Sequence, residues 1–415
     1  MSDNLTVIKK RKFSPSFFAS WEMVLVYILV LINLMLMIFQ PDIYFASGTM
    51  SSMISYSLIS AIMVFGMIFI LLLGDIDVSI ASIMLLSAMF MGYTYGATHN
   101  AFLAILVSIG VGGACGFING YLVSKFKMPA VIVTIATSMI FRGAARIKMG
   151  EDKINTYPSW FSNIGWNNFL GIPVSLWIFI AFAIIFGLIL HTTSYGRKLY
   201  FIGNNPTASL YSGINTMWFK VSVFTIMGAL AGVSAVFFIG RYTGIDYSMG
   251  KGLEMDIIAV CVLGGVSTAG GKGKIYGPVI ATFVYGFLKY ALELMNMEAN
   301  TIKLVTGIVI IIAVIIPLID KQFIDNCYKF FSCSNNKELA SIRFQERDNL
   351  KIIDNEIFRI KEDKTAGEKE KSEKVNALKL KKDEIKKRSN ERYAVVLETV
   401  KAAKAAKNKK IAAKK

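Results

Sequence analysis

Apolar runs long enough to cross a membrane recur over most of the chain. A helix needs about 20 apolar residues to cross the hydrocarbon core of a bilayer, because its backbone polar groups must be satisfied internally. By this rule the pattern predicts ten spans, at residues 21–39, 52–73, 79–95, 101–123, 130–145, 174–191, 218–240, 253–266, 275–295 and 302–318. The fifth and the eighth are the shortest. The predicted fold is therefore an all-α, polytopic transmembrane helical bundle.

Basic residues near these runs predict the orientation of the spans, since Lys and Arg favour the cytoplasmic side of a membrane. With the amino terminus inside, the basic clusters at 9–12, 125–127, 197–220 and 272–274 fall on that side, as does the carboxyl-terminal tail. Five more basic residues fall on the opposite side: Arg142, Arg146, Lys148, Arg241 and Lys251. The balance favours a bundle with both termini in the cytoplasm (N-in/C-in).

Composition agrees with a membrane protein, because 54% of the 415 residues are hydrophobic and the mean hydropathy is +0.52. The net charge is +17, and residues 337–415, with 24 Lys or Arg and 14 Asp or Glu, contribute +10 of it. The remaining excess flanks apolar spans, so nucleic-acid binding is not indicated. We divide the chain into a basic cytoplasmic amino terminus (1–20), a transmembrane domain (21–320) and a charged cytoplasmic tail (321–415).

Residues 337–415 of the tail contain no proline, and their hydrophobic residues recur at helical spacing. This pattern predicts helices. A solvated pair of charged helices with little function of its own is favoured over docking to anionic lipid or to a partner. The Ala/Lys-rich end, residues 401–415, is expected to be frayed or disordered.

Two carboxylates interrupt the apolar pattern in "GDIDVS", where Asp75 and Asp77 lie between the second and third predicted spans. Gly74 can end the second span in a left-handed turn, and Asp77 can accept backbone N–H bonds at the start of the third. Ionisable residues in such a place also tend to face a bundle interior or a water-filled cavity. The pair therefore predicts both helix capping and a position on a substrate pathway.

Asn119, Glu254 and Asp256 are further candidates for this pathway. Asn119 could line it, but the glycines around it recur every four residues, at 112, 116 and 120. They equally predict a close helix contact with Asn119 hydrogen-bonded across it. Glu254 and Asp256 open the eighth span, where acids complement a helix N-terminus, so capping is favoured and pathway lining comes second.

A glycine-rich break, "VLGGVSTAGGKGKIYGP" at residues 262–278, separates the eighth and ninth spans. It is no P-loop, because the glycine spacing differs and neither lysine is followed by Ser or Thr. We therefore expect no bound cofactor or metal, and any ATP would be hydrolysed by a partner ATPase. Catalytic Ser/His, His/Glu or Cys/His spacing is also missing from the sequence, so an enzyme is not indicated.

Three stretches, taken in order, resemble segments of one transport family. "GDIDVSIASIMLLSAM" resembles the pattern G-G-I-D-L-S-x-G-S, "GFINGYLVSKFKMPAVIVTIATSMIFRG" resembles a segment that begins I-N-G and ends R-G, and "LEMDIIAVCVLGGVSTAGGKGKIYGPVIA" resembles a stretch that begins E-L-D and contains G-G-x-G. The family is that of bacterial sugar ABC importer permeases of the ribose, xylose and galactose type. The likeness covers about residues 21–320. Asp75 departs from it, since the family has glycine there.

The resemblance implies a permease subunit in the bacterial plasma (inner) membrane, paired with a second permease copy or a close relative. It also implies an ABC ATPase subunit and an extracytoplasmic sugar-binding protein as partners. The family's ATPase coupling loop matches this chain at Gly203, Asn205, Ala208, Ser212, Gly213 and Ile214. Pro206 departs from the family but suits the first turn of a helix. The acidic residues and the arginine usual in this loop are missing, so shape and backbone contacts would have to replace charge pairing.

The favoured function is the transmembrane permease subunit of an ATP-driven importer for a monosaccharide or similar small polar solute, working by alternating access. A second hypothesis is an ion-coupled secondary transporter that uses Asp75 or Asp77 as a proton or sodium site. A third is an ABC permease for nucleosides or branched-chain amino acids, and a fourth is a membrane anchor whose tail recruits cytoplasmic proteins.

Overall fold

The computed structural model describes residues 21–315, 337–362 and 368–412. The chain separates into two compact units, Met1–Ile316 and Pro317–Lys415, which we call the membrane unit and the tail unit. The predicted basic amino terminus (1–20), the predicted boundary at residue 320 and the end of the tenth predicted span lie outside the described residues. The three-part division of the chain stays a prediction.

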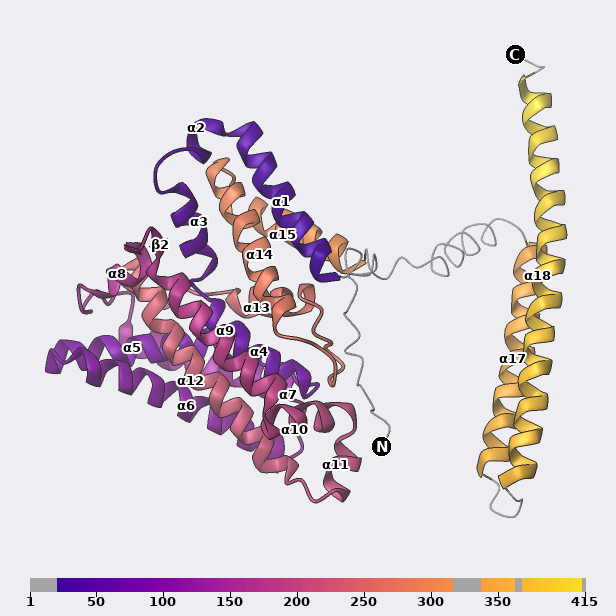
Figure 1. Ribbon diagram of the computed structural model, residues 1–415, viewed down its shortest axis with the longest axis horizontal. Coiled ribbons are helices and arrows are strands. Elements are labelled where there is room, and N and C mark those ends of the chain that lie inside the picture. Colours follow the sequence, from indigo (N-terminus) through magenta and orange to yellow (C-terminus); the bar gives the residue numbers. More distant parts are fainter. Residues whose placement is uncertain (1–20, 316–336, 363–367, 413–415) are drawn as a thin grey trace, which may run out of the picture. The chain divides into compact units, whose positions relative to one another are not determined.

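Within residues 21–315, the membrane unit consists of helices and one short antiparallel pair of strands, β1 with β2 (Figure 1). Its elements in chain order are α1 (Trp21–Phe39), α2 (Pro41–Tyr44), α3 (Thr49–Ser57), α4 (Ala61–Leu72), α5 (Ile80–Thr98), α6 (Ala101–Lys125), α7 (Ala130–Met149), α8 (Phe161–Trp166), β1 (Asn168–Phe169), β2 (Ile172–Pro173), α9 (Val174–Thr192), α10 (Ser194–Asn204), α11 (Pro206–Tyr211), α12 (Thr216–Tyr242), α13 (Leu253–Leu263), α14 (Tyr276–Leu294) and α15 (Ala299–Ile315).

Seven helical segments among the described residues are long and apolar enough to cross a membrane. They are α1, α3 with α4 taken together, α5, α6, α7, α9 and α12. The prediction of a polytopic helical bundle is therefore confirmed, whereas the count of ten spans and the N-in/C-in orientation stay predictions.

The eighth predicted span is shorter than expected. Its helix, α13, has 11 residues and is capped by Gly264, so it rises only about 17 Å, roughly half the thickness of a bilayer core. The reason is that the glycine-rich break begins inside the apolar run. Helix α13 is thus a half-length helix that continues into an irregular loop.

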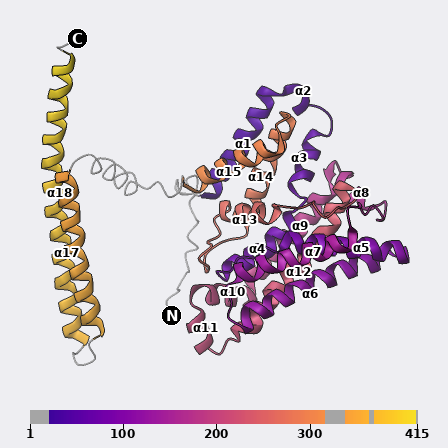
Figure 2. The same ribbon diagram turned by 180° about the vertical axis from the view of Figure 1, so that it is seen from behind.

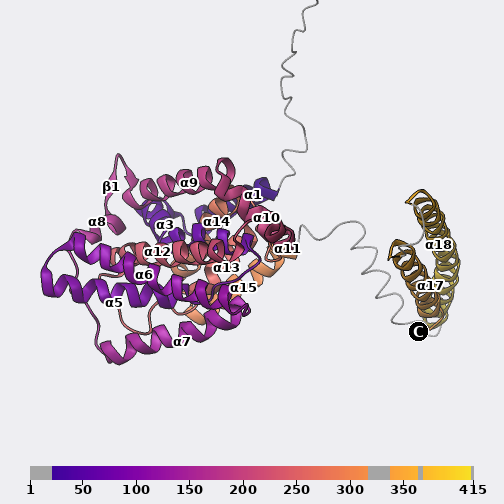
Figure 3. The same ribbon diagram turned by 90° about the horizontal axis from the view of Figure 1, so that it is seen from below.

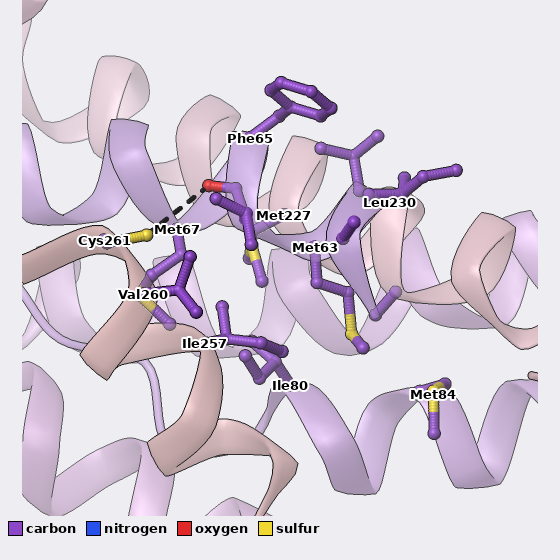
Figure 4. Packing of buried hydrophobic residues seen from close by; sticks show 14 of the residues in the cluster. Met63, Phe65, Met67, Ile80, Met84, Met227, Leu230, Ile257, Val260 and Cys261 are labelled. Atoms are coloured by element: carbon purple, nitrogen blue, oxygen red, sulfur yellow. Dashed lines mark hydrogen bonds between the residues drawn. The ribbon is translucent and has the colours of Figure 1, made fainter. Parts of the chain in front are cut away.

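Helix α4 lies at the centre of the membrane unit, and all twelve of its residues are buried. It contacts α9, α10, α12, α13 and α14. Figure 4 shows Met63, Phe65 and Met67 of α4 among side chains of α5, α12 and α13. The thiol of Cys261 on α13 donates to the Val64 carbonyl oxygen at 3.7 Å. A helix that is apolar on every side is expected to be enclosed in this way.

Helices α6 and α12 lie side by side, as Figures 1 and 3 show, and glycines line their contact. A Cβ atom on Gly112 would lie 2.3 Å from the Gly228 carbonyl oxygen, and one on Gly116 would lie 2.2 Å from the Phe224 carbonyl oxygen. Only hydrogen atoms fit in these spaces. The close helix contact predicted from the glycine spacing is therefore confirmed, with α12 as the partner.

Helices α1, α14 and α15 lie together at one side of the membrane unit (Figure 2). The Trp21 indole N–H at the start of α1 donates to the Leu263 carbonyl oxygen at 2.7 Å. This bond satisfies one of the last carbonyls of α13, which has no donor available inside its own helix. It ties the first helix to the loop that follows α13.

Several basic residues on the unfavoured side of the predicted topology contact aromatic rings and carbonyls. The Arg146 guanidinium lies 4.6 Å from the Tyr247 ring centre, and the Lys251 ammonium lies 5.4 Å from it. Arg142 donates to the Tyr247 carbonyl oxygen at 2.9 Å, while Arg241 stacks on Trp166. These contacts give the basic groups a structural role, since cation–π and carbonyl contacts fix the loop that follows α12.

Among the described residues, the tail unit contains α17 (Lys337–Glu362) and α18 (Glu368–Ala412) (Figure 1). The two helices pack against each other, with Leu339, Ile353, Val375 and Tyr393 buried. The frayed or disordered end expected at residues 401–415 is wrong for most of that range, because α18 continues through Ala412. Alanine and lysine are strong helix formers, which accounts for this continuation.

We expect Gly116→Ala to lower the melting temperature of the purified chain in detergent, because its methyl group has no room against the Phe224 carbonyl. Overpacking of this kind destabilises by about 1–3 kcal/mol. Gly110→Ala is the matched control: it lies on the same helix and its Cβ would meet nothing within 4 Å. Equal melting temperatures for the two variants would contradict a tight α6–α12 contact.

Candidate functional site

The loop between α4 and α5 begins with a left-handed glycine. Gly74 has a φ of +79°, its N–H donates to the Leu71 carbonyl oxygen at 2.9 Å, and the Asp75 N–H donates to that of Ile70 at 3.2 Å. This pair of bonds is the Schellman arrangement that ends many helices. The left-handed turn predicted at Gly74 is confirmed, and it turns the chain so that Asp75 and Asp77 leave the helix axis.

Asp77 organises the start of α5. Its Oδ1 atom accepts from the Ser79 N–H at 2.8 Å and from the Ser79 hydroxyl at 2.6 Å. The Ser79 hydroxyl oxygen in turn accepts from the Asn119 amide at 2.7 Å. All three side chains are buried. The prediction that Asn119 bonds across the glycine contact is wrong, because its partner is Ser79 beside α5, whereas the glycines face α12.

Asp75 forms an ion pair with Lys220, at 2.6 Å between Oδ2 and Nζ. Their side chains are 14% and 22% exposed, so the pair is largely sheltered from solvent. Lys220 lies in the first turns of α12, shortly after the predicted coupling loop. The sequence pattern does not reveal this partner, because 145 positions separate the two residues. The additional carboxylate is thus neutralised by a lysine that follows the coupling loop.

Three chain segments meet at the end of α10. The Gly271 N–H, in the glycine-rich break, donates to the Leu72 carbonyl oxygen at 2.8 Å. A Cβ atom on Gly203 would lie 1.8 Å from the same oxygen and 2.7 Å from the Gly271 nitrogen. The Tyr200 hydroxyl donates to the Gly273 carbonyl oxygen at 2.6 Å. Gly203 therefore packs against the end of α4 and against the glycine-rich break that follows α13. We call this meeting point the loop junction.

The predicted coupling loop forms α11. Asn205 caps it by accepting from the Ala208 N–H at 2.9 Å, and Pro206 occupies its first turn, as expected for proline. Gly213, with a φ of +79°, ends it in a second Schellman arrangement: its N–H donates to Leu210 at 3.0 Å, while the Ile214 N–H donates to Ser209 at 3.2 Å. Ser212 is the C-cap residue.

Two apolar side chains project from α11. Leu210 is 60% exposed and Tyr211 is 87% exposed, and we call them the α11 patch. No pattern in the sequence singles out either side chain. Exposed apolar groups beside each other on a short capped helix are suited to a protein contact.

A cavity of about 480 Å³ lies among α12, α13, α14 and α15. Asp256, in the first turn of α13, forms an ion pair with Lys289 of α14 at 3.2 Å inside it. The polar side chains that line the cavity are Tyr242, Lys251, Asp256, Tyr285, Lys289, Lys303 and Thr306. This size and mixture of rings with a few polar groups suit a small polar solute.

The loop before α13 forms part of the cavity wall. In this loop the Asp246 carboxylate accepts from the Ser248 N–H and hydroxyl, and these bonds hold the pKa of Asp246 below its usual range. Glu254 turns back to accept from the Gly252 N–H at 3.3 Å, which is a bond to the N-cap residue of α13. Glu254 is thus adjacent to the cavity and not part of its lining.

The predicted pathway residues are divided between two places. Asp75 and Asp77 lie in the loop after α4, which Asn119 joins through Ser79, whereas Asp256 lines the cavity. Helix α13 connects the two, because Asp256 is in its first turn and the glycine-rich break that follows it reaches the loop junction. The structure therefore joins both groups through one half-length helix.

Comparisons with known proteins match residues 49–314 to a sequence family described as "Branched-chain amino acid transport system / permease component". The L-arabinose ABC transporter permease protein of Azospirillum brasilense is 32% identical over 66% of this chain and 81% of its own length. The ribose import permease protein of Escherichia coli K12 is 30% identical over 66% and 86%. That of Haemophilus influenzae is 33% identical over 69% and 90%. No solved structure matches the chain.

The Asp75–Lys220 pair can be tested by a double-mutant cycle with Asp75→Asn and Lys220→Gln. We expect the two losses of stability to be non-additive, with a coupling energy of about 0.5–3 kcal/mol, because each single change leaves a sheltered partner without its counter-charge. The measurement is the unfolding free energy in mixed detergent micelles. The exposed Arg146–Glu151 pair, with side chains 59% and 74% exposed, is the control and should show little coupling. Additive losses of stability at Asp75 and Lys220 would show that the ion pair does not stabilise the fold.

Proposed function

The chain belongs to the family of branched-chain amino acid transport system permease components, and from this premise we propose that it is the membrane-spanning subunit of an ATP-driven importer for a monosaccharide. The family match covers residues 49–314, which hold α3 to α14 and most of α15. The chain is accordingly a multi-pass membrane protein with seven membrane-length helices among its described residues.

The observation that carries the choice of substrate is which solutes the similar proteins are named for. Those of A. brasilense and E. coli are named for L-arabinose and ribose, and this chain matches 81% and 86% of their lengths. Both solutes are pentoses, so a five-carbon sugar is the proposed substrate class. The α12–α15 cavity supports a small polar solute, since hydroxyl groups can bond to its Asp256, Lys289 and Tyr285 side chains.

The ATPase would bind at the α11 patch. Leu210 and Tyr211 offer apolar contact area in a loop that lacks the acidic residues and the arginine usual in the family. From there, movement would pass through Gly203 to the loop junction, because this glycine touches the Leu72 carbonyl oxygen and Gly271 without any intervening side chain. Close backbone packing transmits displacement with little loss, since there is no flexible side chain to absorb it.

Helix α13 would link the loop junction to the solute. Its first turn carries Asp256 in the cavity, and its last residue leads into the glycine-rich break at the junction. A displacement that begins at α10 can therefore change the cavity through a single rigid element. This is the proposed basis for alternating access, with ATP used by the partner ATPase and sugar delivered by an external binding protein.

An ion-coupled transporter has less support. Asp75 is neutralised by Lys220, and one oxygen of Asp77 accepts two hydrogen bonds from Ser79. Asp75 therefore has a structural account that requires no transported ion, whereas the buried Oδ2 of Asp77 has no hydrogen-bond partner among the described residues. The relatives named for import of arabinose and ribose favour the ATP-driven class.

The proposed function is tested by uptake in cells that normally produce this chain. We expect deletion of its gene to abolish import of either labelled ribose or labelled arabinose, with import restored by the intact gene. Leucine uptake serves as the control, because the family description also includes amino acid permeases. Unchanged uptake of both pentoses together with loss of leucine uptake would overturn the choice of substrate.

At the coupling loop, binding of the ATPase and transmission of its movement can be tested separately. We expect Leu210→Ala with Tyr211→Ala to reduce co-purification of the ATPase about tenfold, because the exposed apolar contact is lost. Gly203→Ala should leave co-purification intact but uncouple ATP hydrolysis from uptake, since its methyl group collides with the Leu72 carbonyl oxygen. Leu188→Ala, on α9 and 55% exposed, is the control for loss of an exposed apolar group. Normal co-purification of the ATPase with the double variant would show that the ATPase binds at another surface.

A further inference from the structure

Positive charge is concentrated at one end of the tail unit. Helix α17 is neutral, with six basic and six acidic residues, and residues 368–398 of α18 have ten basic and seven acidic ones. Residues 399–412 have five lysines and no acidic residue. We call this last stretch the terminal basic segment. It lies outside the residues that match the transport family.

The packing of the tail helices shows where this segment begins. Lys382 Nζ contacts Asp354 Oδ1 at 2.6 Å, and Ser389 Oγ donates to Glu346 Oε2 at 2.8 Å. These two contacts fix an antiparallel register in which Lys337, the first residue of α17, is level with about Glu398. Helix α18 has 45 residues and α17 has 26, so α18 continues past the end of its partner (Figure 1).

The change in composition coincides with the loss of the partner helix. Glu398 is the last acidic residue, and it stands where α17 begins. Beyond it, Lys401, Lys404, Lys407 and Lys410 recur every three residues, a spacing that keeps them on about half of the helix circumference. A single short helix with clustered like charge is marginally stable alone in water. An anionic surface would relieve the repulsion between these lysine side chains.

Connectivity limits how far this segment can be from the membrane unit. Lys337, which is level with its start, is reached from the end of α15 through residues 316–336, a connection that cannot exceed about 70 Å. The segment therefore extends from the tethered end of the hairpin, whereas the α17–α18 turn is at the other end. Lipid headgroups are consequently present at a high effective concentration around it.

From this register and charge distribution we propose that the terminal basic segment binds anionic lipid headgroups of the membrane that holds the chain. Lysines near an anionic leaflet are attracted to it within a Debye length. The segment offers mainly alanine between its lysines, so little apolar area is available for insertion. The binding is therefore electrostatic and superficial, and it falls as salt rises. It does not depend on which solute is transported.

Hydrogen–deuterium exchange of the full chain in lipid nanodiscs tests this proposal. We expect amides of residues 399–412 to exchange at least tenfold more slowly in discs with 30% phosphatidylglycerol, chosen as roughly the content of an anionic leaflet, than in pure phosphatidylcholine. About 0.5 M NaCl should abolish the difference, because it shortens the Debye length to roughly 4 Å.

Two variants identify the groups responsible. Replacing Lys401, Lys404, Lys407, Lys409 and Lys410 with Gln should remove the protection, while the helix-forming tendency is largely kept. The matched control replaces five lysines of α18 that precede the terminal basic segment with Gln: Lys369, Lys371, Lys379, Lys381 and Lys386. It should retain the protection. Equal exchange in both lipids, or protection that persists at high salt, would overturn the proposal. Protection in phosphatidylcholine discs on addition of RNA at equal charge, with none from phosphatidylglycerol, would instead assign the segment to nucleic acid.

Discussion

Backbone contact at glycine is the interaction on which the membrane unit depends. Between helices in lipid, apolar burial offers little driving force, so association relies on how closely backbones can approach. Glycines of α6 and α12 put carbonyl oxygens where a Cβ atom would otherwise stand. The same device recurs at Gly203, and again where Gly277 meets the Gly264 carbonyl oxygen at the ends of α13 and α14. Close packing thus determines both the stability of the bundle and the points at which movement can pass through it.

The polar groups of the membrane unit are arranged around interruptions in its helices. The loop after α4 and the loop after α13 expose backbone groups, and these groups are satisfied by each other and by α10. Irregular backbone at such places is tolerated when protein encloses it. The carboxylates follow the same logic: Asp77 binds Ser79, Asp75 binds Lys220 and Asp256 binds Lys289. Lysine counter-charges compensate for the desolvation of Asp75 and Asp256, whereas Asp77 is hydrogen-bonded through one oxygen and its buried Oδ2 has no partner among the described residues.

The two units of the chain follow different physical rules. The membrane unit buries α4 completely and turns apolar side chains of α1, α6 and α9 outward, as lipid requires. The tail unit has a narrow apolar seam and charged outer faces, as water requires. Charge in the tail is nearly balanced where α17 and α18 are paired and unbalanced where α18 is alone. This charge imbalance lies in residues that the transport family match, over residues 49–314, does not cover.

Much of this architecture was determined by the sequence itself, because membrane-length apolar runs, helix-ending glycines and a proline at a first helical turn act through local physics. The helical bundle, the left-handed Gly74 and the helical turn at Pro206 could all be read from neighbouring residues. The length of α13 was misjudged because an apolar run does not reveal where hydrogen bonding stops. The partner of Asp75, the meeting of Gly203 with Leu72 and Gly271, and the cavity around Asp256 were decided only by the tertiary structure. Each depends on segments many positions apart, and their distance in space is set by how the helices pack.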